Sequence, residues 1–505
     1  MKKTSISILF ILLIFLPAMG QQKPNVIYIY ADDLGYGDLS CYGAAKLHTP
    51  NIDQLAKRGI RFTNAHSTSA TCTPSRYALM TGQYPWKKKG TGILPGDAAL
   101  IIPMDKITLP RLFRQAGYAT GIVGKWHLGL GDKVEKDWNG EIRPGPNEVG
   151  FDYSFIFPAT ADRVPTVFLE DHRVIALDTT DPIAVNYEHK VGSDPTGKEH
   201  PELLKMRSSP GQGHDNTIIN GIGRIGFMSG GHQARWVDEE LSLTFLSKAT
   251  QFIEDHQRRP FFLYFALTEP HVPRMPATQF KGKSGLGYRG DAILQLDWTV
   301  GQIMKKLRSE GMEKNTIIIF TSDNGPVLDD GYQDRAVTML NGHTPAGALR
   351  GGKYSSLEGG TRIPFIFSWT GQVSPRVSDA LVCQMDLLAS FAHLLKQTIP
   401  ADQATDSENM LTAFLGKNEK GRAVLVEQGL QAPTAIIKDG WKYIQPHPGA
   451  AVMDLVNIES GNSPEPQLYD LRKDIGEKHN IAGQFPDKVK ELDALLNNSK
   501  SGVEK

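Results

Sequence analysis

Chemically active side chains follow five short apolar segments of the chain. Each group alone has an ordinary explanation, because aspartate pairs and Asp-Asn-Gly stretches form turns and a lone cysteine is often a small buried hydrophobe. In an open α/β sheet, however, ligands bind outside the carboxyl ends of the strands, so groups that all follow strands gather at one edge. The five groups are Asp32-Asp33 after 25–31, Cys72-Thr-Pro-Ser-Arg76 after 60–66 and its loop, Lys125-Trp-His127 after 118–123, Glu269-Pro-His271 after 261–267, and Asp323-Asn324-Gly325 after 316–322.

Two kinds of side chain make up these groups, oxygen ligands and cations. Three carboxylates and one amide favour a hard divalent cation, calcium or magnesium, over zinc or copper. Basic side chains would surround an anion beside that cation, and a helix beginning near Pro74 would direct free backbone N–H groups toward it. The sequence therefore predicts a site for an oxyanion ester. The oxygen ligands are Asp32, Asp33, Asp323 and Asn324, and the basic residues are Arg76, Lys125, His127, His271 and Lys353.

The elements that position these residues follow from the hydrophobic pattern. The apolar segments are continuous rather than alternating, which is typical of strands buried on both faces of a mostly parallel sheet. Helical patterns, such as 49–59 and 109–117, lie between them, so we predict an α/β sandwich over residues 21–414. From about residue 415 the apolar runs become shorter and alternate, and an amphipathic stretch covers 485–499. This pattern predicts a small antiparallel sheet with a closing helix as a second domain, 415–505.

The N-terminus and the composition limit the class of protein. Lys2 and Lys3, an apolar run from Ile6 to Leu16 and the ending Ala18-Met19-Gly20 predict a signal peptide, residues 1–20. No cysteine there could carry a lipid and no other stretch reaches membrane length, so we expect a periplasmic or secreted protein of a Gram-negative bacterium without a stable membrane anchor. The 55 basic and 55 acidic side chains balance, which argues against nucleic acid as a partner. Three cysteines without a Cys/His cluster also argue against structural zinc.

The segment Cys72–Gly82, CTPSRYALMTG, resembles the C-x-P-S-R-x-x-x-x-T-G signature of the type I, formylglycine-dependent sulfatases. The resemblance extends over most of the chain and indicates an arylsulfatase-like bacterial glycan sulfatase. The other matching motifs are PNVIYIYADDLGYGD from residue 24, GKWHLG from 124, EPHVP from 269, TSDNG from 321, LRGGKYSSLEGGTRIP from 349 and QLYDLRKDIGEKHNIA from 467.

The resemblance implies an alkaline-phosphatase-like fold and a role for each matching residue. A maturation enzyme would oxidise Cys72 to formylglycine, and residue 72 would also face one calcium ion, or magnesium in its place, held by the four oxygen ligands. Arg76 and Lys125 would orient the aldehyde hydrate and the sulfate, while the basic residues His127, His271 and Lys353 would bind sulfate and move protons. The resemblance leaves Thr160 without a role, and Cys41 and Cys383 resemble structural residues.

The chemistry of formylglycine would explain why a cysteine stands at position 72. An aldehyde hydrate carries two hydroxyls on one carbon. One attacks the sulfur and expels the alcohol, and deprotonation of the other collapses the adduct, which releases sulfate and restores the aldehyde. The cation and the Arg/Lys ring would stabilise charge on the non-reacting oxygens, usually the largest catalytic contribution.

Two other functions fit parts of the pattern. A phosphoesterase of the alkaline phosphatase superfamily, with a serine, threonine or unmodified cysteine nucleophile, would need two zinc ions, but further histidine and aspartate ligands are missing. A non-catalytic glycan-binding homologue should have lost a ligand or the nucleophile, yet every motif position is filled.

The substrate is predicted as a sulfated saccharide. Two segments, 159–178 and 211–236, are rich in Gly, His, Asp and Arg and poor in core pattern, as is typical of recognition loops. Asp171 and His172, at the tip of a predicted hairpin, are the candidates for binding sugar hydroxyls. An overall likeness to such sulfatases suggests galactose or N-acetylgalactosamine 6-sulfate, in host or marine glycans.

Overall fold

The computed structural model describes residues 23–500. The predicted signal peptide lies outside this range. Within it, no helix combines the length and apolar character needed to cross a membrane.

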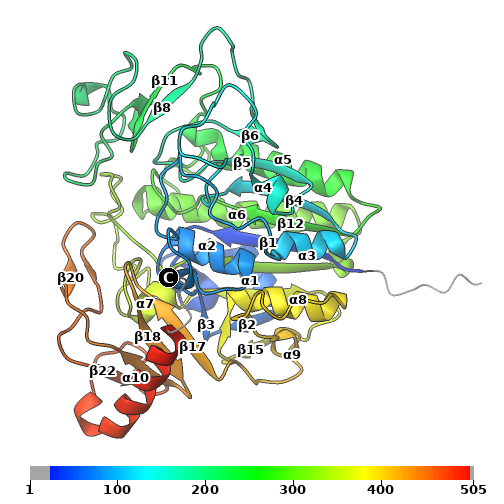
Figure 1. The fold of residues 1–505 in the computed structure, drawn as a ribbon, viewed down its shortest axis with the longest axis vertical. Helices are drawn as coiled ribbons and strands as arrows, with labels where there is room; N and C mark the ends of the chain where they lie inside the picture. The colour runs from blue at the N-terminus through cyan, green and yellow to red at the C-terminus, as the bar shows by residue number, and fades with distance from the viewer. Residues whose placement is uncertain (1–22, 501–505) are drawn as a thin grey trace, which may run out of the picture.

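A ten-stranded sheet, mostly parallel at its centre, forms the middle of the molecule (Figure 1). The strands β13, β1, β12, β4 and β5 run parallel to one another. Antiparallel pairings flank them, of β14 on β13 and of the β6–β7 hairpin on β5. The strand order is β15 (Arg376–Ser378), β2 (Ile60–Phe62), β14 (Phe365–Trp369), β13 (Thr316–Ser322), β1 (Asn25–Ala31), β12 (Phe261–Ala266), β4 (Ala119–Lys125), β5 (Tyr153–Phe157), β6 (Leu169–Glu170) and β7 (Arg173–Val174).

Helices cover both faces of this sheet because its central strands are apolar on both sides. In β1, Tyr28 and Tyr30 belong to one core, while Ile27 and Ile29 belong to the other. The first core includes residues of α2 (Cys72–Thr81), α3 (Leu109–Gln115), α8 (Leu387–Leu395) and α9 (Leu411–Phe414), and the second includes residues of α1 (Pro50–Ala56), α5 (Leu241–Asp255) and α6 (Gly287–Ser309). The continuous apolar runs therefore mark buried strands, as predicted.

The C-terminal part forms a separate antiparallel sheet. Its order is β17 (Val424–Gln428), β18 (Pro433–Lys438), β19 (Trp441–Ile444) and β22 (Gln467–Asp470), and α10 (Pro486–Lys500) packs on β18 and β19. Its core also contains Ala78 of α2 and Cys383 of β16 (Val382–Cys383), which pairs with β3 (Ala65–His66). The small sheet is therefore packed against the helix that begins at Cys72; the boundary at residue 415 stays a prediction.

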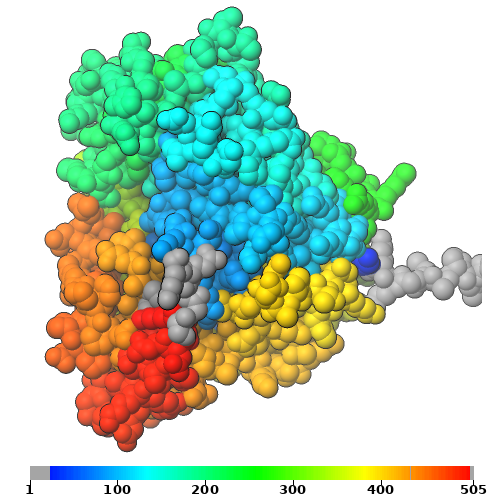
Figure 2. All heavy atoms as spheres, viewed as in Figure 1, coloured from blue at the N-terminus to red at the C-terminus, as the bar shows by residue number. Residues whose placement is uncertain are grey.

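Short hairpins and two short helices complete the fold. The segment between β5 and α5 contains β8 (Ala184–Asn186), β9 (Ile218–Ile219), β10 (Ile222–Gly223) and β11 (Phe227–Ser229), and β20 (Val452–Met453) pairs with β21 (Ile458–Glu459). The helices are α4 (Pro146–Val149) and α7 (Glu358–Thr361). Figure 2 shows the segment around residue 200, in green, directly above the orange C-terminal hairpin region on the left of the molecule. A hydrogen bond of 3.0 Å from Gln212 Nε2 to the Leu455 carbonyl joins the two.

Candidate active site

The predicted oxygen ligands meet at the carboxyl ends of β1 and β13. The two strands are parallel neighbours with Ala31 opposite Ser322, so the residues that follow them come together. The Asp33 amide donates to Asp323 Oδ1 at 3.2 Å, and Asn324 Nδ2 donates to Asp33 Oδ1 at 2.8 Å. Asp32, Asp33, Asp323 and Asn324 are all fully buried.

The helix α2 brings Cys72 and Arg76 to the same place. Cys72 is the first residue of α2, and Arg76 lies about one turn later, on the same side of the helix. The Arg76 guanidinium donates to Asp323 Oδ2 at 2.8 and 3.1 Å and lies 4.8 Å from the centre of the Tyr30 ring. No side chain caps the helix at Thr71, so the first backbone N–H groups of α2, beside Cys72, are not occupied by a capping side chain.

Two lysines bind the aspartates from other elements. Lys125, the last residue of β4, donates to Asp32 Oδ2 at 2.6 Å. Lys353 donates to Asp33 Oδ2 at 2.8 Å and to Asp330 Oδ2 at 2.7 Å. Both lysines are buried, so their positive charges act with little screening on any anion that enters.

Hydrogen bonds define the proton positions of the two histidines. His127 Nε2 lies 2.9 Å from the Leu94 carbonyl, which can only accept, so the ring proton is on Nε2 and Nδ1 is free to accept. That Nδ1 faces Cys72 Sγ at 3.3 Å. His271 Nδ1 donates to the Val272 carbonyl at 2.6 Å, which leaves its Nε2 unprotonated in the neutral ring.

Burial is the largest cause of the pKa shifts in this group. It lowers the pKa of His127 and of His271 well below the usual value, and Lys125 and Lys353 respectively add to the effect. Burial also raises the pKa of the Cys72 thiol, against the opposing effect of Lys125 and Lys353. Both imidazoles are therefore neutral bases at neutral pH before an anion binds.

The donor set fits one hard cation. Asp32 Oδ1 and Asn324 Oδ1 are buried and have no hydrogen-bond partner, although a buried oxygen normally has one. Candidate ligand atoms of Asp32, Asp33 and His271 lie within 4.8 Å of one another. A second cluster in the described part of the chain, His66 with Glu358 and Glu427, already contains a cation, because the ammonium group of Lys442 pairs with both glutamates.

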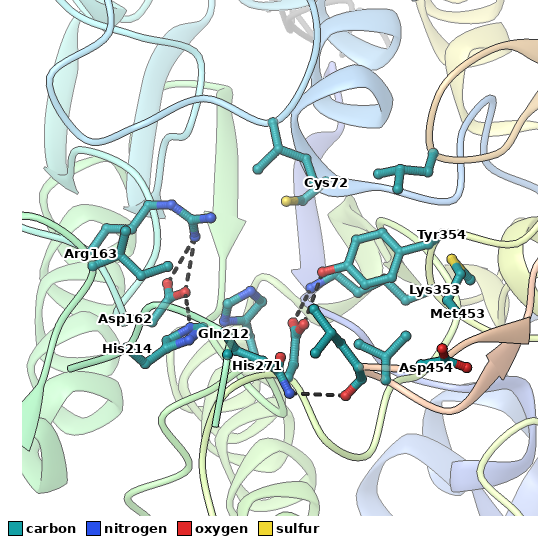
Figure 3. A pocket seen from close by; sticks show the side chains of 17 residues that line it. Cys72, Asp162, Arg163, Gln212, His214, His271, Lys353, Tyr354, Met453 and Asp454 are labelled. Carbon is teal, nitrogen blue, oxygen red and sulfur yellow. Dashed lines mark hydrogen bonds and ion pairs between the residues drawn. The ribbon is translucent and has the colours of Figure 1, made fainter. Parts of the chain in front are cut away.

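A pocket of about 510 Å³ opens from Cys72, within the size range of sites that enclose a small ligand. One wall carries polar residues that were not predicted individually, Asp162, Arg163 and His214 (Figure 3). Arg163 Nη1 donates to both Asp162 oxygens at 3.0 and 3.1 Å, and His214 Nε2 lies 3.0 Å from Asp162 Oδ2. Burial opposes ionisation of Asp162, but Arg163 and His214 hold its pKa well below the usual value.

The comparisons with known proteins agree with this geometry. Residues 24–397 match the family model described as Sulfatase. A relative from Bacteroides thetaiotaomicron, an N-acetylgalactosamine-6-O-sulfatase, is 56% identical over 95% of this chain and 94% of its own length.

This chain belongs to the sulfatase family.

The sulfatase also resembles human arylsulfatase A, at 30% identity over 94% of this chain and 87% of the human protein. A solved 6S-sulfatase structure from a study of glycosaminoglycan metabolism by Bacteroides thetaiotaomicron matches with a TM-score of 0.93 and 56% identity, covering 95% of this chain and 100% of that one. The protein is thus a sulfuric ester hydrolase.

Two of the residues predicted for substrate binding lie elsewhere in the sulfatase. Asp171 and His172 form the tip of the β6–β7 hairpin, but the Asp171 amide bonds the Ser154 carbonyl near the start of β5, and the pocket lies beyond the opposite end of that strand. Asp171 Oδ1 accepts from Asn147 Nδ2 at 3.1 Å, and His172 Nε2 pairs with Glu148 Oε1 at 3.0 Å. Neither residue lines the pocket, so we correct this prediction.

Thr160, Cys383 and Cys41, to which the sequence assigned no catalytic role, lie outside the cluster around Cys72. Thr160 Oγ1 accepts a 2.6 Å hydrogen bond from Arg163, which supports the pocket wall rather than the reaction centre. Cys383 is buried in the core of the small sheet, and Cys41 is half-buried; both are free thiols. Asp162, Arg163 and His214 lie in the two segments that the sequence predicted as recognition loops. Their convergence in space could not be predicted, because it depends on the paths of loops without periodicity.

Proposed function

We propose that this sulfatase removes the 6-O-sulfate from N-acetylgalactosamine in glycans, using formylglycine made from Cys72 by a maturation enzyme and one calcium ion. The observation that carries the proposal is the polar wall of Asp162, Arg163 and His214 in the pocket that also contains Cys72, His271 and Lys353. The 56% identical relative supports the sugar and the position. We also propose export to the periplasm, in keeping with the expected signal peptide.

The calcium ion would bind Asp32, Asp33, Asp323 and Asn324 and stabilise negative charge on sulfate oxygens and on the hydrate at residue 72. The cysteine sulfur occupies the position where the hydrate would carry its oxygens. His127 Nδ1, 3.3 Å from that sulfur, is placed to take the hydroxyl proton whose loss releases sulfate. Lys125 and Lys353 would bind the remaining sulfate oxygens as point charges.

His271 would provide the proton for the leaving alcohol. Its Nε2 is a free acceptor in the neutral ring and lies 3.7 Å from Asp33 Oδ2, at the wall of the pocket. A sulfate ester brings negative charge next to this imidazole, which favours the charged ring. The proton gained on Nε2 can then pass to the departing oxygen.

Asp162, Arg163 and His214 would hold the sugar. A carboxylate accepts from two neighbouring hydroxyls, while guanidinium and imidazole groups donate to ring or acetamido oxygens. The three side chains are already hydrogen-bonded to one another and buried or nearly so, so their positions need little reorganisation when substrate binds. Such a rigid polar group favours one arrangement of hydroxyls over another.

The test is turnover of 6-, 4- and 3-sulfated N-acetylgalactosamine by the matured enzyme and its variants. We expect a clear preference for the 6-sulfate, and a fall in kcat/KM of roughly 10- to 150-fold in Asp162→Ala and Arg163→Gln, the range for loss of a hydrogen bond to a charged group. Arg143→Gln, which changes an exposed arginine paired with Glu141 and Glu148, is the control. A preference for the 3- or 4-sulfate would contradict the proposed 6-position. Unchanged rates in both variants would show that Asp162 and Arg163 do not bind the sugar. Two zinc ions per chain would favour the phosphoesterase.

A further inference from the structure

A buried carboxylate ends the loop that carries two of the proposed cation ligands. Asp32 and Asp33 follow β1, and Asp38 is the last residue of a short 3₁₀ turn, Tyr36–Asp38, in the same loop. The Asp38 side chain has no exposed surface. It does not line the pocket that opens from Cys72, so a role for Asp38 in the reaction has to act through its neighbours.

Asp38 accepts hydrogen bonds from three different parts of the chain. Arg289, in the first turn of α6, donates from Nη1 to Oδ1 at 2.7 Å and from Nη2 to Oδ2 at 2.6 Å. His343 Nε2 donates to Oδ1 at 2.8 Å, and the Gly35 amide donates to Oδ2 at 2.7 Å. Two parallel bonds between a guanidinium and a carboxylate fix direction as well as distance. The end of the loop is therefore held to α6 and to the segment around His343.

The charges of this group are compensated although the group is buried. Arg289 and His343 are almost fully buried, like Asp38 itself. Burial opposes ionisation of Asp38, but Arg289 and His343 hold its pKa below the usual value. The carboxylate is thus charged at neutral pH and accepts from both side chains at once. We call Asp38, Arg289 and His343 the loop clamp.

Backbone contacts join the same loop to the segment that leads to Lys353. The Gly37 amide donates to the Pro345 carbonyl at 2.7 Å. A Cβ at Gly35 would lie 2.2 Å from the Pro345 carbonyl oxygen, and a Cβ at Gly37 would lie 2.3 Å from the Thr344 carbonyl oxygen. Glycine permits this close approach of two backbones. The loop consequently has little room to shift while the clamp is intact.

The backbone of Asp33 requires such support. Its φ is 61°, in the left-handed region that residues other than glycine seldom occupy and that persists where the surrounding structure imposes it. The Asp33 amide donates to Asp323 Oδ1 at 3.2 Å, and the Leu34 amide donates to Ser322 Oγ at 2.9 Å. These bonds hold the start of the loop, and the clamp holds its end. Loss of the clamp would let Asp33 relax toward an ordinary φ and would change the direction of its carboxylate.

We propose that Asp38, Arg289 and His343 are positioning residues for the cation, because they hold Asp32 and Asp33 in the ligating arrangement before the ion binds. The inference rests on the proposed function, which includes one calcium ion at the four oxygen ligands. Partners that orient metal ligands from outside the site typically contribute about 10- to 100-fold to metal affinity. The loop clamp therefore sets the affinity for calcium and does not contact sulfate or sugar.

The experiment is calorimetric titration of calcium into the matured enzyme after chelation. We expect the Kd for calcium to rise about 10- to 100-fold in Asp38→Asn. The matched control is Asp238→Asn, because Asp238 is also a buried carboxylate that accepts two bonds from a buried arginine, Arg224, at 2.9 and 2.6 Å. Its partners in the described chain, Arg224 and Asn220, are not cation ligands, so the control should keep the wild-type Kd even where its free energy of unfolding falls.

His343 provides a milder change that leaves the bond between Asp38 and Arg289 in place. His343→Leu should raise the Kd for calcium about tenfold. His343→Gln should restore it, because the glutamine amide nitrogen can donate from about the position of the histidine Nε2. At saturating calcium both variants should show the wild-type KM and kcat for the sulfated sugar, since residue 343 does not line the pocket.

An unchanged calcium Kd in folded Asp38→Asn or His343→Leu would overturn the inference, and so would a raised KM that saturating calcium does not correct. Equal weakening in Asp38→Asn and Asp238→Asn would also overturn it, because affinity would then follow overall stability. The wild-type titration separates this inference from the proposed function. A wild type that binds no calcium would contradict the proposed cation and the clamp together, whereas calcium binding that is equal in wild type and variants would contradict the clamp alone.

Discussion

Lys442→Met is expected to destabilise the protein strongly, because Lys442 is the central cation of a fully buried charge cluster. Its Nζ lies 2.8 Å from Glu358 Oε1, 3.2 Å from Glu427 Oε2 and 3.5 Å from Glu477 Oε1. The four side chains have no exposed surface. Methionine has a similar length and fills the space, so the change removes charge with little change in packing.

The magnitude follows from the burial. Removing one partner of a buried pair costs about 3–5 kcal/mol, because the remaining charge stays desolvated and unpaired. Here three carboxylates lose their shared partner, while Arg362 still binds Glu358 and His66 still binds Glu427. We therefore expect the free energy of unfolding to fall by about 3–5 kcal/mol at pH 8.

The loss should depend on pH in a defined direction. Burial raises the pKa of Glu477 to about 8, against the opposing charge of Lys442, from a usual value of 4.5. The folded state thus keeps a proton that the unfolded chain releases, so this group lowers stability as pH rises from about 4.5 to about 8. Without Lys442 the carboxylates bind protons more tightly, and the deficit of the variant should be larger at pH 8 than at pH 5.

The assay is denaturant unfolding of wild type and variant at both pH values. The matched control is Lys438→Met, since Lys438 lies on the neighbouring strand and makes a solvent-screened surface pair with Glu491, which contributes little to stability. If Lys442→Met unfolds at the same denaturant concentration as Lys438→Met at pH 8, or loses more stability at pH 5 than at pH 8, the reasoning is wrong.

Three further predictions concern the catalytic site. Asp323→Ala removes a proposed cation ligand and the observed partner of Arg76, so activity should be lost while far-ultraviolet circular dichroism is retained, and chelation should do the same; normal turnover of the variant would contradict the proposed role of Asp323. Mass spectrometry of the peptide containing Cys72 should show aldehyde or hydrate in active enzyme, and full activity with an unmodified thiol would contradict the mechanism. In Gly124→Ala the new Cβ would lie 1.8 Å from the Ala266 carbonyl oxygen, at a backbone φ of 114°. We therefore expect this variant to misplace Lys125 and to have a lower kcat. The control is Gly117→Ala, whose new Cβ would have no neighbouring atom within 4 Å and whose activity should be unchanged.

Much of the reaction centre could be predicted from the sequence because each group directly follows a strand. Continuous apolar runs identify the buried strands, and parallel strands bring their carboxyl ends to one edge. Asp32 and Asp323 therefore meet although they are far apart in the chain. Residue types then indicate the chemistry, since oxygen ligands select a hard cation and surrounding basic residues select an anion.

The recognition surface depends on contacts that no local pattern encodes. The β6–β7 hairpin was a correct prediction as an element, yet its pairing with β5 places Asp171 toward the start of that strand and away from the pocket. Asp162 and His214 meet through loops without periodicity. The small sheet reaches the segment just before α2 through β17, where the Ala70 amide donates to the Gln428 carbonyl at 2.9 Å. The sequence by itself determined the fold class and indicated the candidate reactive groups, because continuous apolar runs identify buried strands and the polar groups directly follow them. Only the tertiary structure decided which loops line the pocket, because their positions depend on packing between segments distant in the chain.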